Sequence, residues 1–491
     1  MKKLVPLLAV AVALPALVAA TPAPAALSWF PCRTLSQEWD QRDTRSECTR
    51  VSVPVDYANP EGRRLDLMVS RIKATSPAKR QGVLVVNPGG PGNSGLSLPL
   101  TLSRTTVAGM NTDHDVVGFD PRGVGFSGGV ECDRAPEDGP DPDPNASPAE
   151  KYRQSYEQTA KQNARCTSYD PEFIANLSTD VVARDLDRIR IALGEPKISY
   201  YGVSWGTALG AVYRSRYDAH VDRMLLDSVM PPDFSVRTMN DGPIRAAEAN
   251  FDRFAGWLAA RDSQYHLGTT AAQVRASATA LAARLDAHPL RTTTPDGKPA
   301  TFAGANLRTV LSYQQAHWPA MAETLTAARD GNPPPLLGNE PEYSSFGLRG
   351  TPYGGLLMQV SVLCNDQGAD PSEPRMWREE QERQAASPLF NGQAGYAHWC
   401  AGWPLPKQPW HLTRGTSALQ LVGHRTELTT PLFWAQEMRR RIGGDLLTVD
   451  NGAHGSLDLV ACGAKAVEFF STGRTATGSC PGEPAVSSTT D

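Results

Sequence analysis

One short motif constrains this chain more than any other feature: residues 202–206 read Gly-Val-Ser-Trp-Gly. The motif follows an apolar, strand-like run at 197–201 and precedes a helix-like run at 207–213. A serine between two glycines at a strand-to-helix junction indicates a tight, strained turn, because only small flanking residues let the backbone pass so close to its neighbours. Such a turn raises the hydroxyl at the carboxyl edge of a sheet, where the positive end of the next helix points at it. We therefore predict that Ser204 is a nucleophile in acyl transfer.

Further apolar runs around this turn follow the order of a parallel sheet. Residues 83–86 form a continuous apolar run, as a strand buried on both faces does, and similar runs occur at 115–119 and 221–227. A helical pattern at 179–193 lies between two of these runs. Such alternation predicts an α/β fold with a mostly parallel central sheet and helices on both faces. Near the end of the chain, strand patterns return at 418–423 and 446–449, with a helical pattern at 431–441 between them.

The pattern changes after Pro231-Pro232. Residues 233–415 contain helical stretches and loops without strand–helix alternation, and they include six of the ten tryptophans, for which packing between helices is the expected role. We interpret this region as a large, mainly helical cap inserted into the core. The predicted organisation is a first core segment at 27–232, the cap at 233–415, a second core segment at 416–480 and a disordered tail at 481–491.

The amino terminus is typical of a secretory signal. Lys2 and Lys3 precede the apolar run 4–18, and alanine-rich residues 19–26 supply a cleavage region. The apolar run is short for a membrane span and contains two prolines. We therefore expect residues 1–26 to be removed and the mature protein to be secreted, without a membrane partner.

Eight cysteines agree with export, because an even number of cysteines in a secreted chain implies disulfide bonds. Their spacing favours pairing between neighbours in the sequence. The disulfide bonds expected from this spacing are Cys32–Cys48, Cys132–Cys166, Cys364–Cys400 and Cys462–Cys480.

Composition and spacing also exclude some classes of function. The formal net charge is −4 and no basic block is present, so a nucleic-acid partner is not expected. Neither a Cys-x-x-Cys nor a His-x-x-x-His spacing occurs, which argues against a zinc site, and we expect no metal and no cofactor. The sequence does not reveal the oligomeric state; a monomer is the working expectation.

A serine nucleophile needs a base, and His454 is the best candidate. It follows the last predicted strand in the run Asp-Asn-Gly-Ala-His-Gly at 450–455. In hydrolases with this strained serine turn, the chain order is serine, acid, histidine. His424 is the nearest alternative, but it lies before the expected acid rather than after it.

The acid of such a triad holds the histidine in the correct tautomer and comes from the loop after the preceding strand. Glu427 is the only carboxylate in that loop, residues 423–431. Glutamate is one methylene longer than aspartate, so the loop must retract slightly to keep a hydrogen bond to the imidazole. Asp445 and Asp450 remain alternatives.

Transition-state stabilisation in acyl transfer needs two backbone donors. We expect one to be the N–H of Trp205, which follows the nucleophile, and the other to be the N–H of Gly90 in the glycine-rich loop 89–92. A phosphate-binding loop is the competing interpretation, but the Gly-x-x-x-x-Gly-Lys pattern is absent.

Several motifs together resemble a known family. Asn-Pro-Gly-Gly-Pro-Gly at 87–92, Asp-Pro-Arg-Gly-Val-Gly-Phe-Ser at 120–127 and the serine motif occur in the order found in the prolyl iminopeptidase branch of the α/β-hydrolases. The pattern is most similar to the secreted tripeptidyl aminopeptidases of actinobacteria, a likeness that extends to residues 185–190, to Cys-Asn-Asp at 364–366 and to the last two cysteines. The resemblance implies a serine exopeptidase that releases short peptides, often tripeptides, from free N-termini.

Two positions depart from the family pattern. Asn87 stands where the intracellular prolyl enzymes have histidine, although the tripeptidyl branch is similar to this chain there. The acid loop of the family reads Asp-Pro-x-Thr-Pro, whereas residues 427–431 here read Glu-Leu-Thr-Thr-Pro. Glutamate keeps the negative charge of the family's aspartate but has a longer side chain. We therefore expect the difference to affect the activity and the substrate rather than the class of reaction.

An exopeptidase must also bind the substrate ammonium, usually with a carboxylate. Asp366 is the candidate we name, with Glu340 and Glu342 of the cap as further candidates and a structural salt bridge as the alternative role. The expected partner is a peptide or a small-molecule substrate. A second hypothesis is an esterase or amidase that uses the same triad on a small non-peptide molecule, and a third is a non-catalytic binding protein on a hydrolase scaffold.

Overall fold

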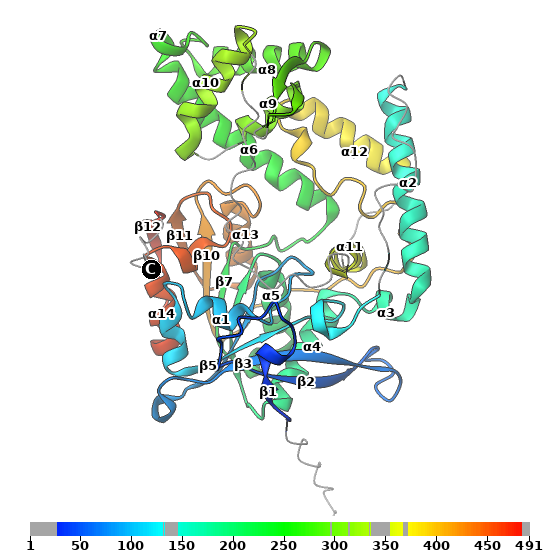
Figure 1. Cartoon of the computed structure of the whole chain (residues 1–491), viewed down its shortest axis with the longest axis vertical. Helices are drawn as coiled ribbons and strands as arrows, with labels where there is room; N and C mark the ends of the chain where they lie inside the picture. The colour runs from blue at the N-terminus through cyan, green and yellow to red at the C-terminus, as the bar shows by residue number, and fades with distance from the viewer. Residues whose placement is uncertain are drawn as a thin grey trace, which may run out of the picture.

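The computed structural model describes residues 27–130, 132, 146–294, 297–312, 315–332, 334, 354–366 and 372–483. The predicted signal segment, Glu340 and Glu342 lie outside these residues. Figure 1 shows a sheet flanked by helices in the lower half of the molecule and a group of helices above it.

The sheet has ten strands, in the order β1-β2-β3-β5-β4-β6-β7-β10-β11-β12. The first three strands pair antiparallel, and the seven strands from β5 to β12 pair parallel. This arrangement confirms the predicted α/β class. The strands are β1 (Phe30–Pro31), β2 (Glu47–Pro54), β3 (Arg64–Ile72), β4 (Gly82–Asn87), β5 (His114–Phe119), β6 (Ile198–Val203), β7 (Val221–Asp227), β10 (Ala418–His424), β11 (Asp445–Asp450) and β12 (Gly478–Pro481).

Helices cover both faces of the sheet. Successive residues of each central strand point to opposite faces, so each strand contributes side chains to two separate hydrophobic clusters. In β4, Val83 and Val85 belong to the same hydrophobic cluster as side chains of α4 (Thr179–Ala192), α5 (Trp205–Tyr217) and α13 (Leu432–Ile442). Leu84 and Val86 pack on the other side with α1 (Leu98–Leu102) and α14 (Gly463–Thr472). Each such fully buried aliphatic side chain contributes about 1.5–3 kcal/mol of transfer free energy.

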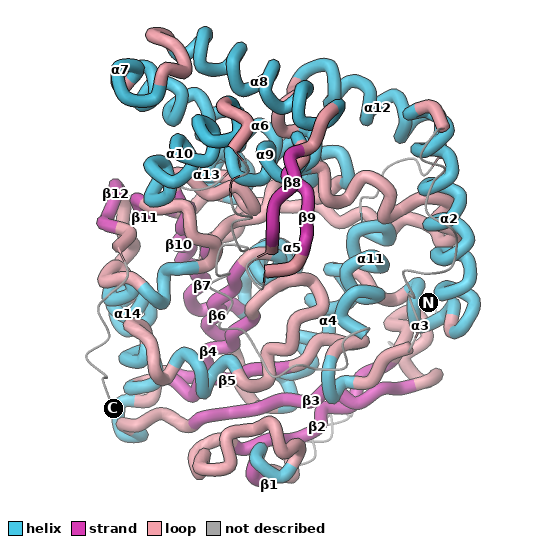
Figure 2. Tube along the Cα trace, turned by 45° about the horizontal axis from the view of Figure 1, so that its top comes forward, coloured by secondary structure: helices cyan, strands magenta, loops and turns pink. Residues whose placement is uncertain are grey.

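In the stretch predicted as the cap, between β7 and β10, the described residues form helices, loops and one two-stranded hairpin, β8 (Leu290–Thr293) with β9 (Pro299–Phe302) (Figure 2). The sequence analysis did not predict this hairpin. Much of this stretch has a hydrophobic core of its own, built around side chains such as Phe251, Phe254 and Leu285. Its helices are α6 (Val236–Ala259), α7 (Asp262–Tyr265), α8 (Ala271–Ala287), α9 (Gly304–Leu311), α10 (Trp318–Arg329), α11 (Gly354–Asp366) and α12 (Glu373–Ala386).

Before β6, the chain forms α2 (Pro148–Tyr169) and α3 (Pro171–Ala175). α2 contacts α12, and Figure 1 shows it along one side of the molecule. The first core segment therefore supports the cap from the side.

Four disulfide bonds are present, and they join the pairs that the spacing favours: Cys32–Cys48, Cys132–Cys166, Cys364–Cys400 and Cys462–Cys480.

The predicted tail begins too early at 481, because Pro481 is the last residue of β12 and pairs with Asp450. Residues 484–491 lie outside the described chain. Among the described residues, no helix combines the length and the apolar character that a membrane crossing requires.

A buried ion pair ties the first core segment together. The Arg122 guanidinium donates to both carboxylate oxygens of Asp185, at 2.6 Å each, and neither side chain is exposed. Arg122 also donates to the carbonyl oxygens of Pro54 and Val55. The pair thus joins the loop after β5, helix α4 and the end of β2.

We expect Asp185→Ala to lower the free energy of unfolding by about 3–5 kcal/mol, because it leaves a buried guanidinium without its counter-ion. Urea unfolding of both proteins measures the loss. Arg153→Ala, which breaks ion pairs on the exposed side of α2, is the control and should change stability little. An equal effect of the two substitutions would contradict the role given to the buried pair.

Candidate active site

Ser204 lies at the carboxyl end of β6, in the strained turn that the sequence predicts. Its φ is 57° and its ψ is −128°, a conformation that residues with a side chain rarely adopt. The glycines are required by close approach: a Cβ on Gly202 would lie 2.4 Å from the carbonyl oxygen of Gly206, and one on Gly89 would lie 2.8 Å from Cβ of Ser204. The glycine-rich loop after β4 therefore packs directly against the serine turn.

His454 and Glu427 come together at the ends of two neighbouring strands. Glu427 lies in the loop after β10 and His454 in the loop after β11, and these strands pair in parallel. Nδ1 of His454 lies 2.5 Å from Oε1 of Glu427. Glu427 is buried, whereas about a third of the His454 side chain is exposed. No hydrogen bond between Ser204 and His454 is found among the described residues, and such bonds are often long in a site without substrate.

The buried carboxylate of Glu427 is held by several donors. Oε1 also accepts from the backbone N–H of Thr430 at 3.1 Å and from the Thr430 hydroxyl at 2.5 Å. Oε2 accepts from the Ser228 hydroxyl at 3.0 Å. Burial opposes the ionised form, but the charge and hydrogen bond of His454, the charge of His424 and the bond from Thr430 outweigh it and hold the pKa of Glu427 below its usual range.

The two alternative acids named from the sequence lie apart from this contact. Asp450 forms an ion pair with Arg425 at 2.5 Å, and Asp445 accepts from the hydroxyl of Thr475 at 2.6 Å. Among the hydrogen bonds of the described residues, only Glu427 supplies a carboxylate to His454.

His424 forms a second, fully buried histidine–carboxylate pair. Its Nε2 lies 2.9 Å from Asp227 Oδ1 and its Nδ1 lies 2.7 Å from Asn451 Oδ1, so both ring nitrogens are occupied. Burial lowers the pKa of His424, but the charge and hydrogen bond of Asp227 overcompensate, with help from Glu427 and Asn451, and raise it to about 9. The contacts with Asp227 and Asn451 therefore favour the protonated form of the buried His424 ring.

Near this pair lies a carboxyl group in an unusual environment. Asp458 is almost completely buried, and neither of its carboxyl oxygens has a hydrogen-bond partner among the described residues. Burial raises the pKa of Asp458 to about 7, and the negative charge of Asp227 adds to the effect. This cluster carried no signal in the sequence, because Asp227 lies far from Asp458 along the chain.

The two expected oxyanion donors both lie next to the serine turn. Trp205 is the first residue of α5, and Gly90 follows the glycine that packs against Ser204. Within the described part of the chain, we find no protein acceptor for the N–H of either residue. The assignment of these two N–H groups as an oxyanion hole stays a prediction.

Asp366 lies in a different setting from the one expected of an ammonium-binding residue. It is fully buried; Oδ1 accepts from the N–H of Thr179 and Oδ2 from the indole of Trp410, each at 2.9 Å. Burial raises its pKa to about 7, although these hydrogen bonds oppose the shift. With its oxygens engaged and closed to solvent, Asp366 has a structural role, but it acts through hydrogen bonds from neutral donors and not through the salt bridge that was the alternative interpretation.

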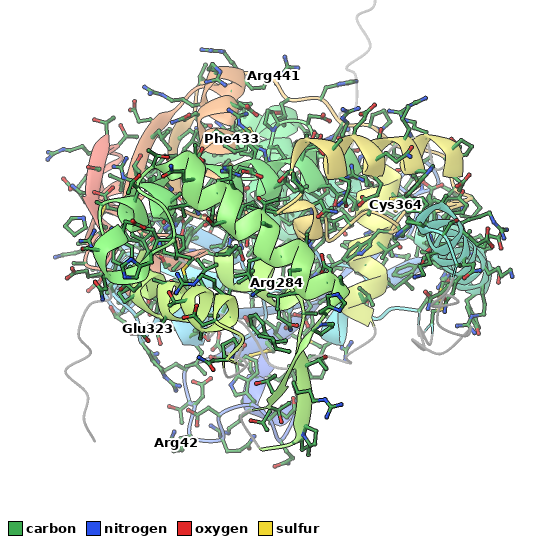
Figure 3. All side chains as sticks on the ribbon, turned by 90° about the horizontal axis from the view of Figure 1, so that it is seen from above. Arg42, Arg284, Glu323, Cys364, Phe433 and Arg441 are labelled. Carbon is green, nitrogen blue, oxygen red and sulfur yellow. A yellow bond between two sulfur atoms is a disulfide. The ribbon has the colours of Figure 1, made fainter. Side chains whose placement is uncertain are left out.

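That role connects the cap to the serine turn. The indole of Trp205 donates to the Thr179 hydroxyl at 3.0 Å, and Thr179 is bonded in turn to Asp366 at the end of α11. The two preceding residues make further contacts. Cys364 forms the disulfide with Cys400, and the Asn365 side chain donates to the carbonyl oxygens of Ile174 and Leu177. Figure 3, seen from above, labels Cys364 among the helices of the cap.

A small pocket of about 60 Å³ adjoins Gly90. Its walls come from the loop after β4, the start of the cap, helix α11 and the loop before β10, which is why the sequence alone did not reveal it. Among the described residues, the lining is aliphatic and aromatic apart from one amide, and no charged side chain belongs to it: Gly90, Pro91, Met230, Phe234, Met239, Gln359, Leu363, Tyr396 and Trp399. No group of three or more potential metal ligands occurs among the described residues.

Comparison with known proteins relates the chain to one family. A family model described as "alpha/beta hydrolase fold" matches residues 82–316, and one described as "TAP-like protein" matches residues 387–480. The chain is 33% identical to a tripeptidyl aminopeptidase of Streptomyces lividans, over 94% of this chain and 87% of that protein. It is 27% identical to the serine protease Hip1 of Mycobacterium tuberculosis, over 87% and 85%. It is also 32% identical to a carboxylesterase B of that organism, over 87% and 84%.

We expect Asp458→Asn to stabilise the protein more at pH 8 than at pH 5, by about 2 kcal/mol. The folded-state pKa of Asp458 is about 7, against 3.8 for the free group, so the folded protein holds this proton more tightly. The corresponding stability is present at low pH and is lost as the pH rises through 7. Asparagine does not titrate and should remove this loss. Urea unfolding at both pH values is the measurement, and an equal effect at both would contradict the prediction.

Proposed function

Because the chain belongs to the α/β-hydrolase family and to its branch of TAP-like proteins, we propose that it is a secreted serine aminopeptidase that releases tripeptides from free N-termini. The observation that carries the proposal is the contact between His454 and Glu427 at the strand ends beside the Ser204 turn. A strained serine, a histidine and a buried carboxylate in this chain order are the parts that acyl transfer needs.

In the proposed reaction, Ser204 Oγ attacks a peptide carbonyl carbon while Nε2 of His454 takes the hydroxyl proton. The Nδ1–H of His454 donates to Glu427, which keeps the ring in the correct tautomer and stabilises the imidazolium. The N–H groups of Trp205 and Gly90 donate to the oxyanion of the tetrahedral intermediate. His454 then gives its proton to the leaving amine, and an acyl-enzyme remains. A water molecule, activated by the same histidine, releases the peptide acid and restores Ser204.

The pocket beside Gly90 supports a proposal about which side chain is preferred on the substrate residue that supplies the attacked carbonyl. If Gly90 binds the oxyanion, the side chain of that residue lies close to this pocket. Because the described lining carries no charge, it favours a small uncharged side chain there; a charged one would lose its hydration without gaining a counter-ion.

Secretion is supported by two observations. Residues 1–26 have the composition of a signal segment, and the described chain contains four disulfide bonds, which persist in oxidising compartments. The proposal includes a peptide substrate, no metal or cofactor, and no nucleic-acid or membrane partner.

An esterase or amidase for a small non-peptide substrate is the second candidate. It is favoured by the relative named carboxylesterase B. The same three catalytic residues would serve, so the two candidates differ only in what the cap admits. A non-catalytic binding protein is the weaker choice, because the nucleophile, base and acid are all present.

We expect the purified protein to hydrolyse a tripeptide amide with a chromogenic leaving group and a free amine, and to leave its N-acetylated twin almost intact. Ser204→Ala should lower kcat by about 10⁶-fold. Turnover of a short acyl ester in the same assay, with no activity on either peptide, would transfer the assignment to the esterase. Equal activity of the Ser204→Ala protein would refute the nucleophile.

We further expect Glu427→Gln to lower kcat by about 10²- to 10⁴-fold with little change in KM, because the amide favours the wrong imidazole tautomer while the site keeps its shape. Steady-state kinetics on the tripeptide amide measure both constants. Asp450→Asn is the matched control, since Asp450 pairs with Arg425 on the surface, and it should retain full activity. Loss of activity in the control instead would indicate a different acid.

A further inference from the structure

Ser228, the first residue after β7, has a backbone conformation that normally favours glycine. Its φ is 55°, and it is one of three residues other than glycine with a positive φ in the described chain. A residue with a Cβ is strained in this region. Ser228 is also fully buried, so solvent does not satisfy its hydroxyl. The presence of serine instead of glycine at this strained position suggests that the hydroxyl group has a specific role.

The contacts of the hydroxyl identify that use. It donates to Oε2 of Glu427 at 3.0 Å and accepts from the backbone N–H of Gly455 at 2.8 Å. Gly455 directly follows His454. One oxygen atom therefore bridges the carboxylate of the acid and the backbone of the loop that carries the base.

The residue before Ser228 holds the same two loops. Asp227 pairs with His424, three residues before Glu427, and accepts from the N–H of Leu457, three residues after His454. The backbone N–H of Ser228 donates to the carbonyl of Val422. The end of β7 thus fixes the loops after β10 and β11 relative to each other, and Ser228 is the member of this arrangement that touches Glu427.

A glutamate has one more rotatable bond than an aspartate, so its carboxylate has more orientations to lose when it binds an imidazole. Fixing Oε2 leaves Oε1 directed at His454 Nδ1. Resting on the proposed function, we propose that Ser228 is a positioning residue for the triad: its hydroxyl orients the carboxylate of Glu427 and sets the loop of His454 against it.

The test is Ser228→Gly, measured by kinetics on the tripeptide amide or the ester that the wild-type protein turns over. Glycine removes the hydroxyl and at the same time relieves the positive φ, so the fold should be kept. We expect kcat to fall about 10- to 100-fold with KM unchanged. The melting temperature should change little, because relief of the positive φ offsets the loss of one hydrogen bond to the buried carboxylate. His266→Gly is the matched control: His266 has a φ of 52° in the exposed surface of the cap, and relieving it should leave kcat unchanged.

A double-mutant cycle adds a readout that a merely structural role would not move. The shorter side chain in Glu427→Asp draws the carboxylate away from Ser228, so Ser228→Gly should cost much less in that background than in the wild type. Equal losses in both backgrounds, an unchanged kcat in the single variant, or a loss of kcat together with a lower melting temperature would each overturn the positioning role.

Failure of the proposed function gives a different result. The aminopeptidase proposal fails if the wild-type protein turns over the ester but not the peptide, and Ser228 can then still be tested on the ester. The hydrolase assignment fails as a whole if neither substrate is hydrolysed and Ser204 does not react with a fluorophosphonate probe. A wild-type protein that is active, with a Ser228→Gly variant that matches it, refutes only the inference about Ser228.

Discussion

The ionised carboxylate of Glu427 is the group around which the site is organised. Burying a charged carboxylate is costly unless donors and an opposite charge compensate it. Here the donors come from three separate segments: Ser228 after β7, Thr430 after β10 and His454 after β11. The parallel pairing of these strands brings their carboxyl ends to one edge of the sheet. The geometry of the site therefore depends on the register of the sheet as much as on the residues themselves.

Much of this arrangement could be read from the sequence, because it is encoded locally. The two glycines around Ser204 and the continuous apolar runs define the turn and its strands within a few residues. The positions of Glu427 and His454 follow from the strands that precede them. The four cysteine pairs are neighbours in the sequence, and the structure joins those same pairs.

Other features could not be predicted, because they depend on burial and on distant partners. Asp366 has the charge expected of an ammonium-binding residue, and only the structure shows that its oxygens face Thr179 and Trp410 in the interior. Ser228 is one serine among many until its φ and its contact with Glu427 are known. The pocket beside Gly90 collects residues from widely separated parts of the chain. The hairpin of β8 and β9 is short and partly polar, so its pattern is weak.

Hydrogen bonds connect Asp366 through Thr179 to Trp205, and they make one part of the cap more sensitive to substitution than the rest. Helices α7 to α10 rest largely on a hydrophobic core of their own. Helix α6 contributes to that core and also supplies Met239 to the pocket beside Gly90. Helix α11 ends in the residues that hold the serine turn, so a change there reaches the nucleophile. Substitutions that keep the separate core of the outer helices filled should therefore leave the nucleophile in place, whereas substitutions at the end of α11 act on it through Thr179.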